Sequence, residues 1–424
     1  MLKLGTFIVD CTPPVGCGVL FGIIDATTSV RDPLLLRGFV LDDEGYRCLI
    51  ATMDFCGLMN SAYDDLVRTL AKAANAPEER VIIHCIHQHD APLLNYEIEA
   101  YLNCETYPMQ WWTDVLKKCA QSAAECLDRM VTISSLGYNE TRLHGYASNR
   151  RILGFDGKVV GMRFSKCSDT SLRNKPVGVI DPMLRTVAFK DSSGKIAGSL
   201  SFYATHPQVS NGRNMYSADA PGEALNLLEG HLCDGLHGFF TGAGGNVTAG
   251  KYSSATDKEG NLLMFGKILA DGISLNLGAM KWEDARELHW HSAEFPFPAQ
   301  QMDKDKLLSQ INDESISHQE RLRTAVLLTC LEYEKNTSYH MSLLRMGSVK
   351  MLFLPGELFV EYQLYAQSLI PDEFLAVASN CSDNFLYLPL AKHFEERGYE
   401  FSFCWCTTDF ERRFKKALPG VLSR

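Results

Sequence analysis

The sequence predicts an α/β protein in which mixed β-sheets are stacked on one another and flanked by helices. Three observations carry this prediction. Runs of β-branched and aromatic residues recur along the 424-residue chain, and amphipathic helical patterns lie between many of them. Some neighbouring runs are joined by short turns and others by helices. Short turns make antiparallel pairs and helical crossovers make parallel pairs, so both kinds are expected in the same sheets.

The expected strands are short apolar runs bounded by turn residues. The turn DDEG lies between the first two, and the turn KDSSGK at 190–195 is typical of a hairpin connection. The expected strands cover residues 34–41, 48–55, 81–86, 184–189, 198–205, 349–354 and 374–379.

Helical periodicity predicts helices at 61–74, 109–130, 220–232 and 258–276, and one long helix near 303–334. The chain has no Ser/Gly-rich linker or low-complexity segment that would mark a boundary between domains. We therefore expect residues 1–424 to form a single domain.

Composition argues against several kinds of partner and location. The chain carries 41 Lys and Arg against 51 Asp and Glu, a net charge of −10 that argues against nucleic acid. No apolar stretch approaches the roughly 18 residues of a transmembrane segment. The N-terminus lacks the apolar core of a signal peptide. The 14 cysteines are scattered without a CxxC motif, so free thiols and a cytoplasmic location are expected.

Residues of the types used in catalysis and metal binding follow the ends of four expected strands. The pair His87 and His89 follows 81–86, and His206 follows 198–205. Glu357 follows 349–354, and the loop 243–246 follows the run GFFTG. Ligand sites in open α/β sheets gather outside strand ends, so these four ends can meet in one crevice.

Taken singly, the histidines allow more than one interpretation. On extended backbone, His87 and His89 point to the same side and suit a metal, although two solvated loop histidines fit the spacing as well. His84 has the opposite parity from His87 and is expected to pack or to face outward. His206 alone is weak evidence for a ligand.

Taken singly, the acidic and aromatic candidates also do not indicate one specific role. Gly356 can supply a backbone angle that aims Glu357 inward, but a glutamate is also favoured in the first turn of a helix. Tyr387 alone indicates only a packed aromatic side chain.

Together, the motifs resemble those of the neutral/alkaline ceramidases and their bacterial homologues, in the same order. The resemblance extends from about residue 5 to 410, and its specificity comes from the number and order of the motifs. They are DCTPPVG at 10–16, DPLLLRGFVLDDEGYRCLIATMDFCGL at 32–58, HQHDAP at 87–92, NRR at 149–151, YATHPQV at 203–209, SADAPGEALNLLE at 217–229, GAGGNVT at 242–248, LPGE at 354–357 and YLP…RGYE at 387–400.

The resemblance implies a neutral-ceramidase-like catalytic domain with a Zn²⁺ site formed by His87, His206, Glu357 and Tyr387. It also implies that His89 lies beside the metal and helps to hold the substrate. Two imidazoles, a carboxylate and a phenolic oxygen suit zinc, which can activate water at neutral pH.

Two further residues match the family through NRR and RGYE. They are Arg150 and Tyr399, and the separation between Tyr387 and Tyr399 is the one that the family keeps. Arg150, His89 and Tyr399 can then orient an acyl oxygen and stabilise its developing negative charge. The implied function is zinc-dependent hydrolysis of an amide by metal-activated water.

The sequence departs from the family in the segment that matches D-V-S-P-N, whose serine has a catalytic role there. Here the segment is 246–250, and Thr248 stands at the serine position. The chain is also expected to lack the C-terminal β-domain of the long ceramidases. We therefore expect a small N-acyl or lipid-like substrate that need not be a sphingolipid. Hydrolysis of another acyl or ester bond on a polar metabolite, or zinc binding without turnover, are the alternatives.

Overall fold

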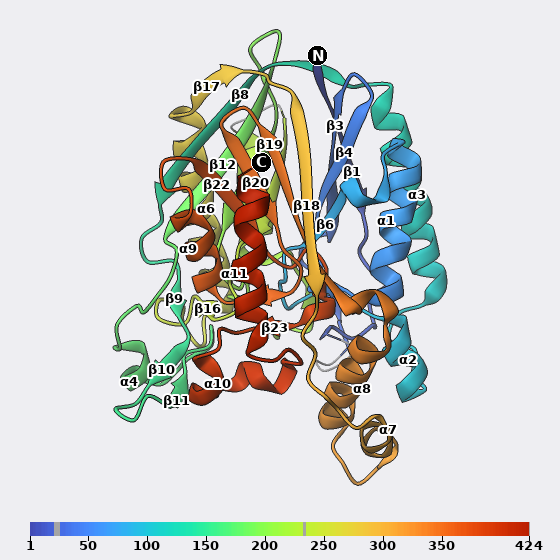
Figure 1. The fold of residues 1–424 in the computed structure, drawn as a ribbon, viewed down its shortest axis with the longest axis vertical. Coiled ribbons are helices and arrows are strands. Elements are labelled where there is room, and N and C mark those ends of the chain that lie inside the picture. Colours follow the sequence, from blue (N-terminus) through green and yellow to red (C-terminus); the bar gives the residue numbers. More distant parts are fainter. Residues whose placement is uncertain (21–25, 232–234, 424) are drawn as a thin grey trace.

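Two mixed β-sheets lie face to face in the computed structural model, which describes residues 1–20, 26–231 and 235–423 (Figure 1). Within these ranges the larger sheet has nine strands, in the order β15-β13-β12-β8-β1-β3-β4-β6 with β17 paired to β8, and the smaller has four, in the order β18-β19-β20-β22. Their bounds are β1 (Leu2–Asp10), β3 (Leu35–Asp43), β4 (Tyr46–Met53), β6 (Val81–Cys85), β8 (Val131–Arg142), β12 (Met183–Asp191), β13 (Ile196–Tyr203), β15 (Leu236–Thr241), β17 (Lys281–Asp284), β18 (Leu288–Pro296), β19 (Ser338–Met346), β20 (Val349–Phe353) and β22 (Phe374–Ala378).

Helices cover the outer faces of both sheets. The longer helices α1 and α3 pack on one half of the larger sheet and α5 and α6 on the other half, while α8 and α11 pack on the smaller sheet (Figure 1). The helices are α1 (Asn60–Ala74), α2 (Tyr96–Leu102), α3 (Met109–Leu127), α4 (Thr170–Arg173), α5 (Asp219–His231), α6 (Lys258–Gly278), α7 (Lys304–Asn312), α8 (His318–Glu332), α9 (Val360–Ser368), α10 (His393–Glu396) and α11 (Asp409–Leu422).

Short strands and single turns lie mainly in the connecting loops. The short strands are β2 (Ser29–Val30), β5 (Gly57–Leu58), β7 (Leu93–Leu94), β9 (Ser148–Asn149), β10 (Arg151–Leu153), β11 (Val159–Met162), β14 (Met215–Tyr216), β16 (Val247–Thr248), β21 (Glu357–Leu358) and β23 (Tyr387–Leu388). The 3₁₀ turns are η2 (Glu78–Arg80), η3 (Glu334–Thr337), η4 (Asp383–Phe385) and η5 (Tyr399–Phe403). None of the described helices is both long and apolar enough to cross a bilayer.

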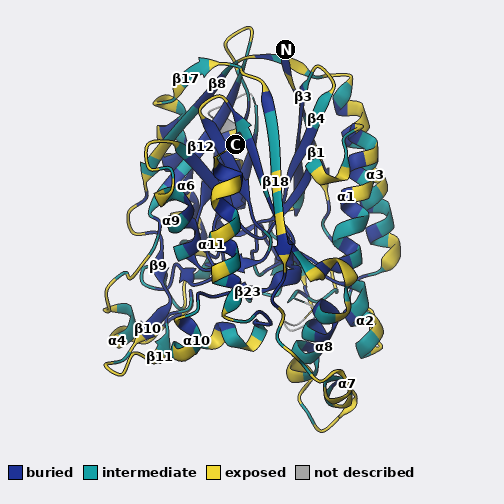
Figure 2. Cartoon of the chain, viewed as in Figure 1, coloured by how far each residue is buried: buried dark blue, intermediate teal, exposed yellow. Residues whose placement is uncertain are grey.

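The core between the two sheets is apolar and strongly buried (Figure 2). Phe39 and Ile50 of the larger sheet belong to the same cluster as Met351 and Phe353 of the smaller one. Each of these side chains is at most 1% exposed. Burying side chains of this size contributes about 1.5–3 kcal/mol each, so the contact between the sheets makes a rigid frame for the loops at its edge.

One supersecondary pattern occurs three times in the described chain. An antiparallel hairpin is followed by a helix and a strand parallel to the second hairpin strand: β3-β4-α1-β6, β12-β13-α5-β15 and β19-β20-α9-β22. Parallel strands point their carboxyl ends in one direction, so each unit delivers two strand ends to the same edge of its sheet. The site described below lies at these ends.

His84 ties the three parallel strand ends together. Its Nδ1 donates to the carbonyl of Ser379 at 2.6 Å, and its Nε2 accepts from the backbone N–H of Thr241 at 2.9 Å. The N–H of Ser379 donates to the Thr241 carbonyl at 2.9 Å. His84 has no exposed surface and burial lowers its pKa to about 3, so it is a neutral packing residue.

The predicted strands and most predicted helices occur close to their expected positions, and the 190–195 turn joins β12 and β13. Residue 232 of the predicted helix 220–232 lies outside the described residues. The single long helix near 303–334 is wrong, because α7 ends at Asn312 and α8 begins at His318. Between them Asp313 accepts from the Ser315 N–H and hydroxyl, and Ser317 caps α8.

Candidate active site

Two histidines and one glutamate from separate strand ends converge on a single point. The Nε2 atoms of His87 and His206 each lie 3.2 Å from Oε2 of Glu357. One ligand-type atom from each residue lies within 4.8 Å of the other two, and all three residues are buried. The convergence of strand ends predicted from the sequence is therefore present. Which residues act in catalysis stays a prediction.

The backbone turns sharply to direct His87 inward. His87 follows β6 and adopts a left-handed conformation with φ +66°, which costs a non-glycine residue about 1–2 kcal/mol. Its N–H donates to the Phe55 carbonyl at 3.0 Å and its Nδ1 donates to the Cys56 carbonyl at 2.8 Å. The expectation of extended backbone through His87 is thus wrong, because these loop contacts override the strand period. The ring of His89 nevertheless lies edge-on to that of His87, with centroids 5.3 Å apart.

Glu357 is aimed by the glycine before it. Gly356 has φ +81°, and Glu357 then pairs in parallel with Tyr387 through the short strands β21 and β23. The helix α9 begins only at Val360, so Glu357 lies before that helix and not in its first turn. The pairing also brings the Tyr387 hydroxyl to 3.4 Å from Nε2 of His206.

The tautomers of the two converging histidines follow from their backbone partners. Nδ1 of His87 faces the Cys56 carbonyl, and Nδ1 of His206 faces the Gly244 carbonyl at 2.7 Å. A carbonyl accepts only, so both Nδ1 atoms carry hydrogen and both Nε2 atoms are left to face Glu357. Histidine ligands of metals are commonly oriented in this way, and two imidazoles with one carboxylate suit a divalent cation.

The electrostatics of this cluster centre on Glu357. Burial opposes its charge, but the protonated imidazole of His87 and its hydrogen bond to the carboxylate outweigh burial and hold the pKa of Glu357 well below its usual range. Burial likewise opposes charge on His87, yet the carboxylate of Glu357 raises the pKa of His87 well above its usual value. The centre therefore favours one positive charge next to Glu357, a place that a proton or a metal ion can fill.

His89 and His206 are neutral. Burial, with the charge of His87 and the nearby His206, holds the pKa of His89 well below its usual value. Burial and the Arg150 guanidinium lower the pKa of His206. Nε2 of His89 is buried and makes no hydrogen bond with any described residue, so it is available to a bound molecule.

Arg150 lies over the aromatic side of the site. Its guanidinium carbon is 5.2 Å from the ring centroid of Tyr387 and 5.7 Å from that of Tyr399. Atom Nη2 of Arg150 is buried and has no hydrogen-bond partner in the described ranges. Burial raises the pKa of both tyrosines, which are therefore phenols, and Tyr399 is 38% exposed at the edge of the site.

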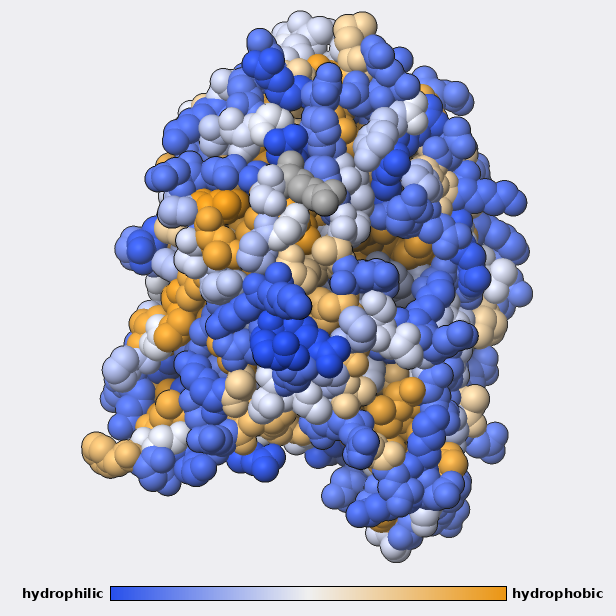
Figure 3. All heavy atoms as spheres, viewed as in Figure 1, coloured by the Kyte–Doolittle hydropathy of each residue, from blue (hydrophilic) through white to orange (hydrophobic). Residues whose placement is uncertain are grey.

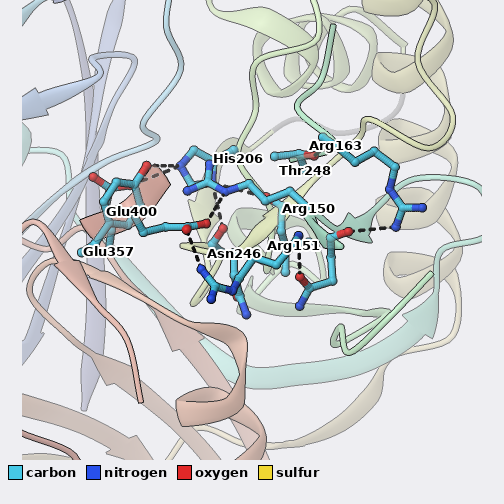
Figure 4. A network of polar contacts seen from close by, with 12 residues as sticks. Arg150, Arg151, Arg163, His206, Asn246, Thr248, Glu357 and Glu400 are labelled. Atoms are coloured by element: carbon cyan, nitrogen blue, oxygen red, sulfur yellow. Dashed lines mark hydrogen bonds and ion pairs between the residues drawn. The ribbon is translucent and has the colours of Figure 1, made fainter. Parts of the chain in front are cut away.

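Glu400 holds Arg150 in place (Figure 4). Its Oε1 accepts from Nε of Arg150 at 2.8 Å, and its Oε2 accepts from Nη1 of Arg151 at 2.7 Å. Glu400 has no exposed surface and both arginines are nearly as buried. This shared carboxylate orients the unused Nη2 of Arg150, as a supporting partner orients a functional group elsewhere.

The hydroxyl of Thr248 is already used by the backbone. It donates to the Arg163 carbonyl at 2.8 Å, and both residues are labelled in Figure 4. It also accepts from the Gly250 N–H at 3.3 Å. Thr248 has no exposed surface and pairs with Ser148 between β16 and β9. Both hydrogen bonds of the hydroxyl within the described chain are to the backbone, so the structure does not bring this hydroxyl into the polar cluster.

Comparison with known proteins reveals the fold. No protein-family model and no curated protein matches this sequence. The crystal structure of neutral ceramidase from Pseudomonas aeruginosa matches with a TM-score of 0.75 at 15% identity, over 98% of this chain and 73% of that chain. A ceramidase complexed with C2 matches with a TM-score of 0.74 at 15% identity, over 98% and 74%. The fold is that of neutral ceramidase. The fold class predicted from the sequence is confirmed.

Within the neutral ceramidase fold, seven of the eight predicted site residues form one group. His87, His206 and Glu357 share the centre, and the other four surround it. The hydroxyl of the eighth, Thr248, makes the two backbone contacts described above. The four surrounding residues are His89, Arg150, Tyr387 and Tyr399.

The sequence did not identify the groups that support this centre in the neutral ceramidase fold. Carbonyl oxygens of Cys56 and Gly244 orient the two histidines, and Glu400 orients Arg150. Asp383 lies 3.8 Å from Nδ1 of His87, and burial raises the pKa of Asp383 to about 7. Glu400 is the last residue of the RGYE motif, so the motif was the only available signal for it.

Proposed function

We propose that this chain is a zinc-dependent amidohydrolase that cleaves the amide bond of an N-acyl substrate. The observation that carries the proposal is the buried pair of Nε2 atoms on one Glu357 oxygen. Two imidazole nitrogens and a carboxylate oxygen are the ligands expected at a catalytic zinc site with an open position. Zinc, when bound, would polarise the acyl carbonyl and lower the pKa of water toward neutrality. His87, His206 and Glu357 would hold the ion, with the Tyr387 hydroxyl beside His206 as a fourth group.

Arg150 is assigned to the acyl oxygen. Its Nη2 is a buried, charged donor without a partner in the described chain, and Glu400 fixes the orientation of the guanidinium. A donor that is already oriented stabilises negative charge without reorganising during the reaction, and such a donor is worth about 10²–10³ in rate. The Tyr399 hydroxyl at the half-exposed edge can assist in placing the same oxygen.

His89 is assigned to proton transfer. Its neutral ring and its unused Nε2 suit a group that takes a proton from water and returns it to the leaving amine. The Thr248 hydroxyl, which donates its hydrogen to a backbone carbonyl, is less suited to attack the substrate. We therefore favour attack by water, with Thr248 as a residue that holds the loop.

The substrate class rests on the structural neighbours, which are ceramidases by name. We infer an N-acyl or lipid-like substrate, since a shared fold at this low identity does not carry the identity of the acyl chain or amine. A buried guanidinium and an aromatic edge are compatible with an acyl group entering from the side of Tyr399.

The test is metal analysis of the purified protein combined with turnover of a panel of N-acyl amines and matched esters. We expect about one zinc per chain and faster cleavage of amides. His206→Ala and Glu357→Ala should lose most of the metal, whereas His237→Ala, at a buried histidine outside the site, should keep it. Arg150→Met should keep zinc and lose about two orders of magnitude in turnover.

Three outcomes would contradict this proposal. Full zinc occupancy in both ligand variants would remove the metal assignment. Zinc binding without turnover of any panel member would favour a binding protein. Faster cleavage of the esters would favour the alternative acyl hydrolase.

A further inference from the structure

A short hairpin beside the site exposes apolar side chains at its tip. The strands β10 and β11 are joined by a turn at 154–158. Phe155 in this turn has 116% of its reference exposure, and the flanking Leu153 and Val160 are 48% and 64% exposed. The hairpin forms the lower left corner in Figure 1, and Figure 3 shows apolar surface at that corner.

The hairpin is held firmly, so this exposure is not a consequence of a loose loop. Its turn closes through Gly154 N–H to the Lys158 carbonyl at 2.8 Å, and Gly157 supplies a positive φ of +74°. Lys158 Nζ donates to the Glu395 carbonyl at 2.7 Å, and Arg151 at the base is paired with Glu400. An aromatic side chain presented to water on a rigid support is a signal of a binding surface.

The segment that contains the hairpin is basic in composition, in contrast with the whole chain. The segment 152–180 contains five Lys and Arg but only two Asp and Glu, whereas the whole chain carries −10. The side chains of Lys158, Lys166 and Lys175 are exposed. An exposed apolar tip in a segment with exposed lysines and a net positive charge suits the interface of an anionic lipid bilayer.

The same segment also forms one wall of the candidate active site. It begins directly after Arg150, whose guanidinium carbon lies 5.6 Å from the ring centroid of Phe164. The Phe164 ring meets that of Tyr399 edge to face at 5.3 Å, at the exposed edge of the site. The base of the hairpin therefore lies next to this edge of the site.

We propose that the hairpin of β10 and β11 docks this protein on anionic lipid bilayers by inserting Phe155, Leu153 and Val160 between the head groups. The bilayer then presents an N-acyl substrate to the side of Tyr399 and Phe164. This role in substrate delivery rests on the proposed function, whereas the docking itself does not. A narrow protrusion suits insertion among lipids better than a protein interface, which needs about 800 Å² on each partner.

The experiment measures binding of the full chain to phosphatidylcholine vesicles with and without phosphatidylglycerol, by flotation. The wild-type protein should float with the anionic vesicles. Phe155→Ser should weaken this binding about tenfold or more, from the loss of one buried aromatic side chain. The matched control is Leu275→Ser, which changes a 65% exposed apolar residue near the end of α6 and should bind as the wild type does.

A second readout reports insertion directly. The fluorescence of Phe155→Trp should shift to the blue on anionic vesicles and be quenched by brominated lipid, whereas that of Leu275→Trp should not respond. Phe155→Ser should keep the metal content of the wild type and its turnover of a water-soluble N-acyl amine, and should lose turnover only of vesicle-borne substrate.

The proposal fails if the wild type does not float, if Phe155→Ser floats equally well, or if vesicles leave the fluorescence of Phe155→Trp unchanged. It also fails if Phe155→Ser only dissociates an oligomer in sedimentation without vesicles, since the tip would then be a protein interface. Vesicle binding by a wild-type protein that hydrolyses no soluble N-acyl compound would leave the docking intact and refute the proposed function instead.

Discussion

Replacing Glu400 by glutamine tests whether one buried carboxylate organises the arginine side of the site. Glu400 accepts from Arg150 at 2.8 Å and from Arg151 at 2.7 Å, and none of the three side chains is more than 3% exposed. In Glu400→Gln one amide oxygen can still accept from one arginine. The amide N–H₂ must then face an N–H of the other arginine. Both buried guanidinium groups lose the negative charge of Glu400, and one of them also loses its hydrogen-bond acceptor.

The expected loss of stability is large. Breaking a buried ion pair by removing one partner costs about 3–5 kcal/mol. The entropy of unfolding is about 2.1 cal/mol/K per residue, or about 0.9 kcal/mol/K for this chain, so the Tm should fall by about 3–6 °C. Turnover should fall as well, because Arg150 is no longer oriented toward the acyl oxygen, while the zinc content should not change.

Calorimetry of Glu400→Gln and of Glu396→Gln provides the comparison. Glu396 also pairs with Arg151, at 3.1 Å, but its side chain is 16% exposed, and the same Nη2 of Arg151 donates to the Arg397 carbonyl at 2.6 Å. Glu396→Gln should therefore cost less than about 1 kcal/mol. Equal losses of Tm in the two variants, or normal turnover in Glu400→Gln, would refute the reasoning.

Two other predictions concern Thr248 and Asp90. Thr248→Val should lower the free energy of unfolding by about 1–3 kcal/mol, because two buried backbone groups lose their partner. Thr248→Ser should retain stability and turnover, and a trapped acyl-threonine in mass spectrometry would contradict attack by water. Burial raises the pKa of Asp90 from 3.8 to about 6, so the folded state loses stability as the pH rises from 3.8 to about 6. Asp90→Asn should therefore gain about 3 kcal/mol relative to the wild type between about pH 4 and pH 7 in urea unfolding, and a difference that is independent of pH would contradict this.

Local sequence signals were sufficient to predict most of the strands and to recognise the motifs in their order. The strands at 81–86 and 349–354 stand out because β-branched and apolar residues end at turn residues, and such signals are local. The long helix near 303–334 shows the limit of this approach. Its periodicity continues through 313–317, but the Asp313 turn and the Ser317 cap compete with the helix for the backbone N–H groups.

The backbone at His87 shows a second limit. Parity along a strand predicts the direction of a side chain only while the strand lasts, and β6 ends at Cys85. The left-handed turn at His87 is maintained by carbonyls of Phe55 and Cys56, which come from the end of another strand. Period-two reasoning therefore could not predict where its imidazole points.

The sequence by itself determined which kinds of ligand atoms the chain carries and in which order they follow its strands. That order was enough to predict the neutral ceramidase fold and the residues that converge around Glu357. Only the tertiary structure decided which atoms meet. Arg150 and Glu400 are 250 positions apart, so their ion pair depends on the packing of the whole chain. The use of the Thr248 hydroxyl by the backbone and the exposure of Phe155 are likewise results of packing, because exposure and hydrogen bonding belong to a position in the fold and not to a residue type.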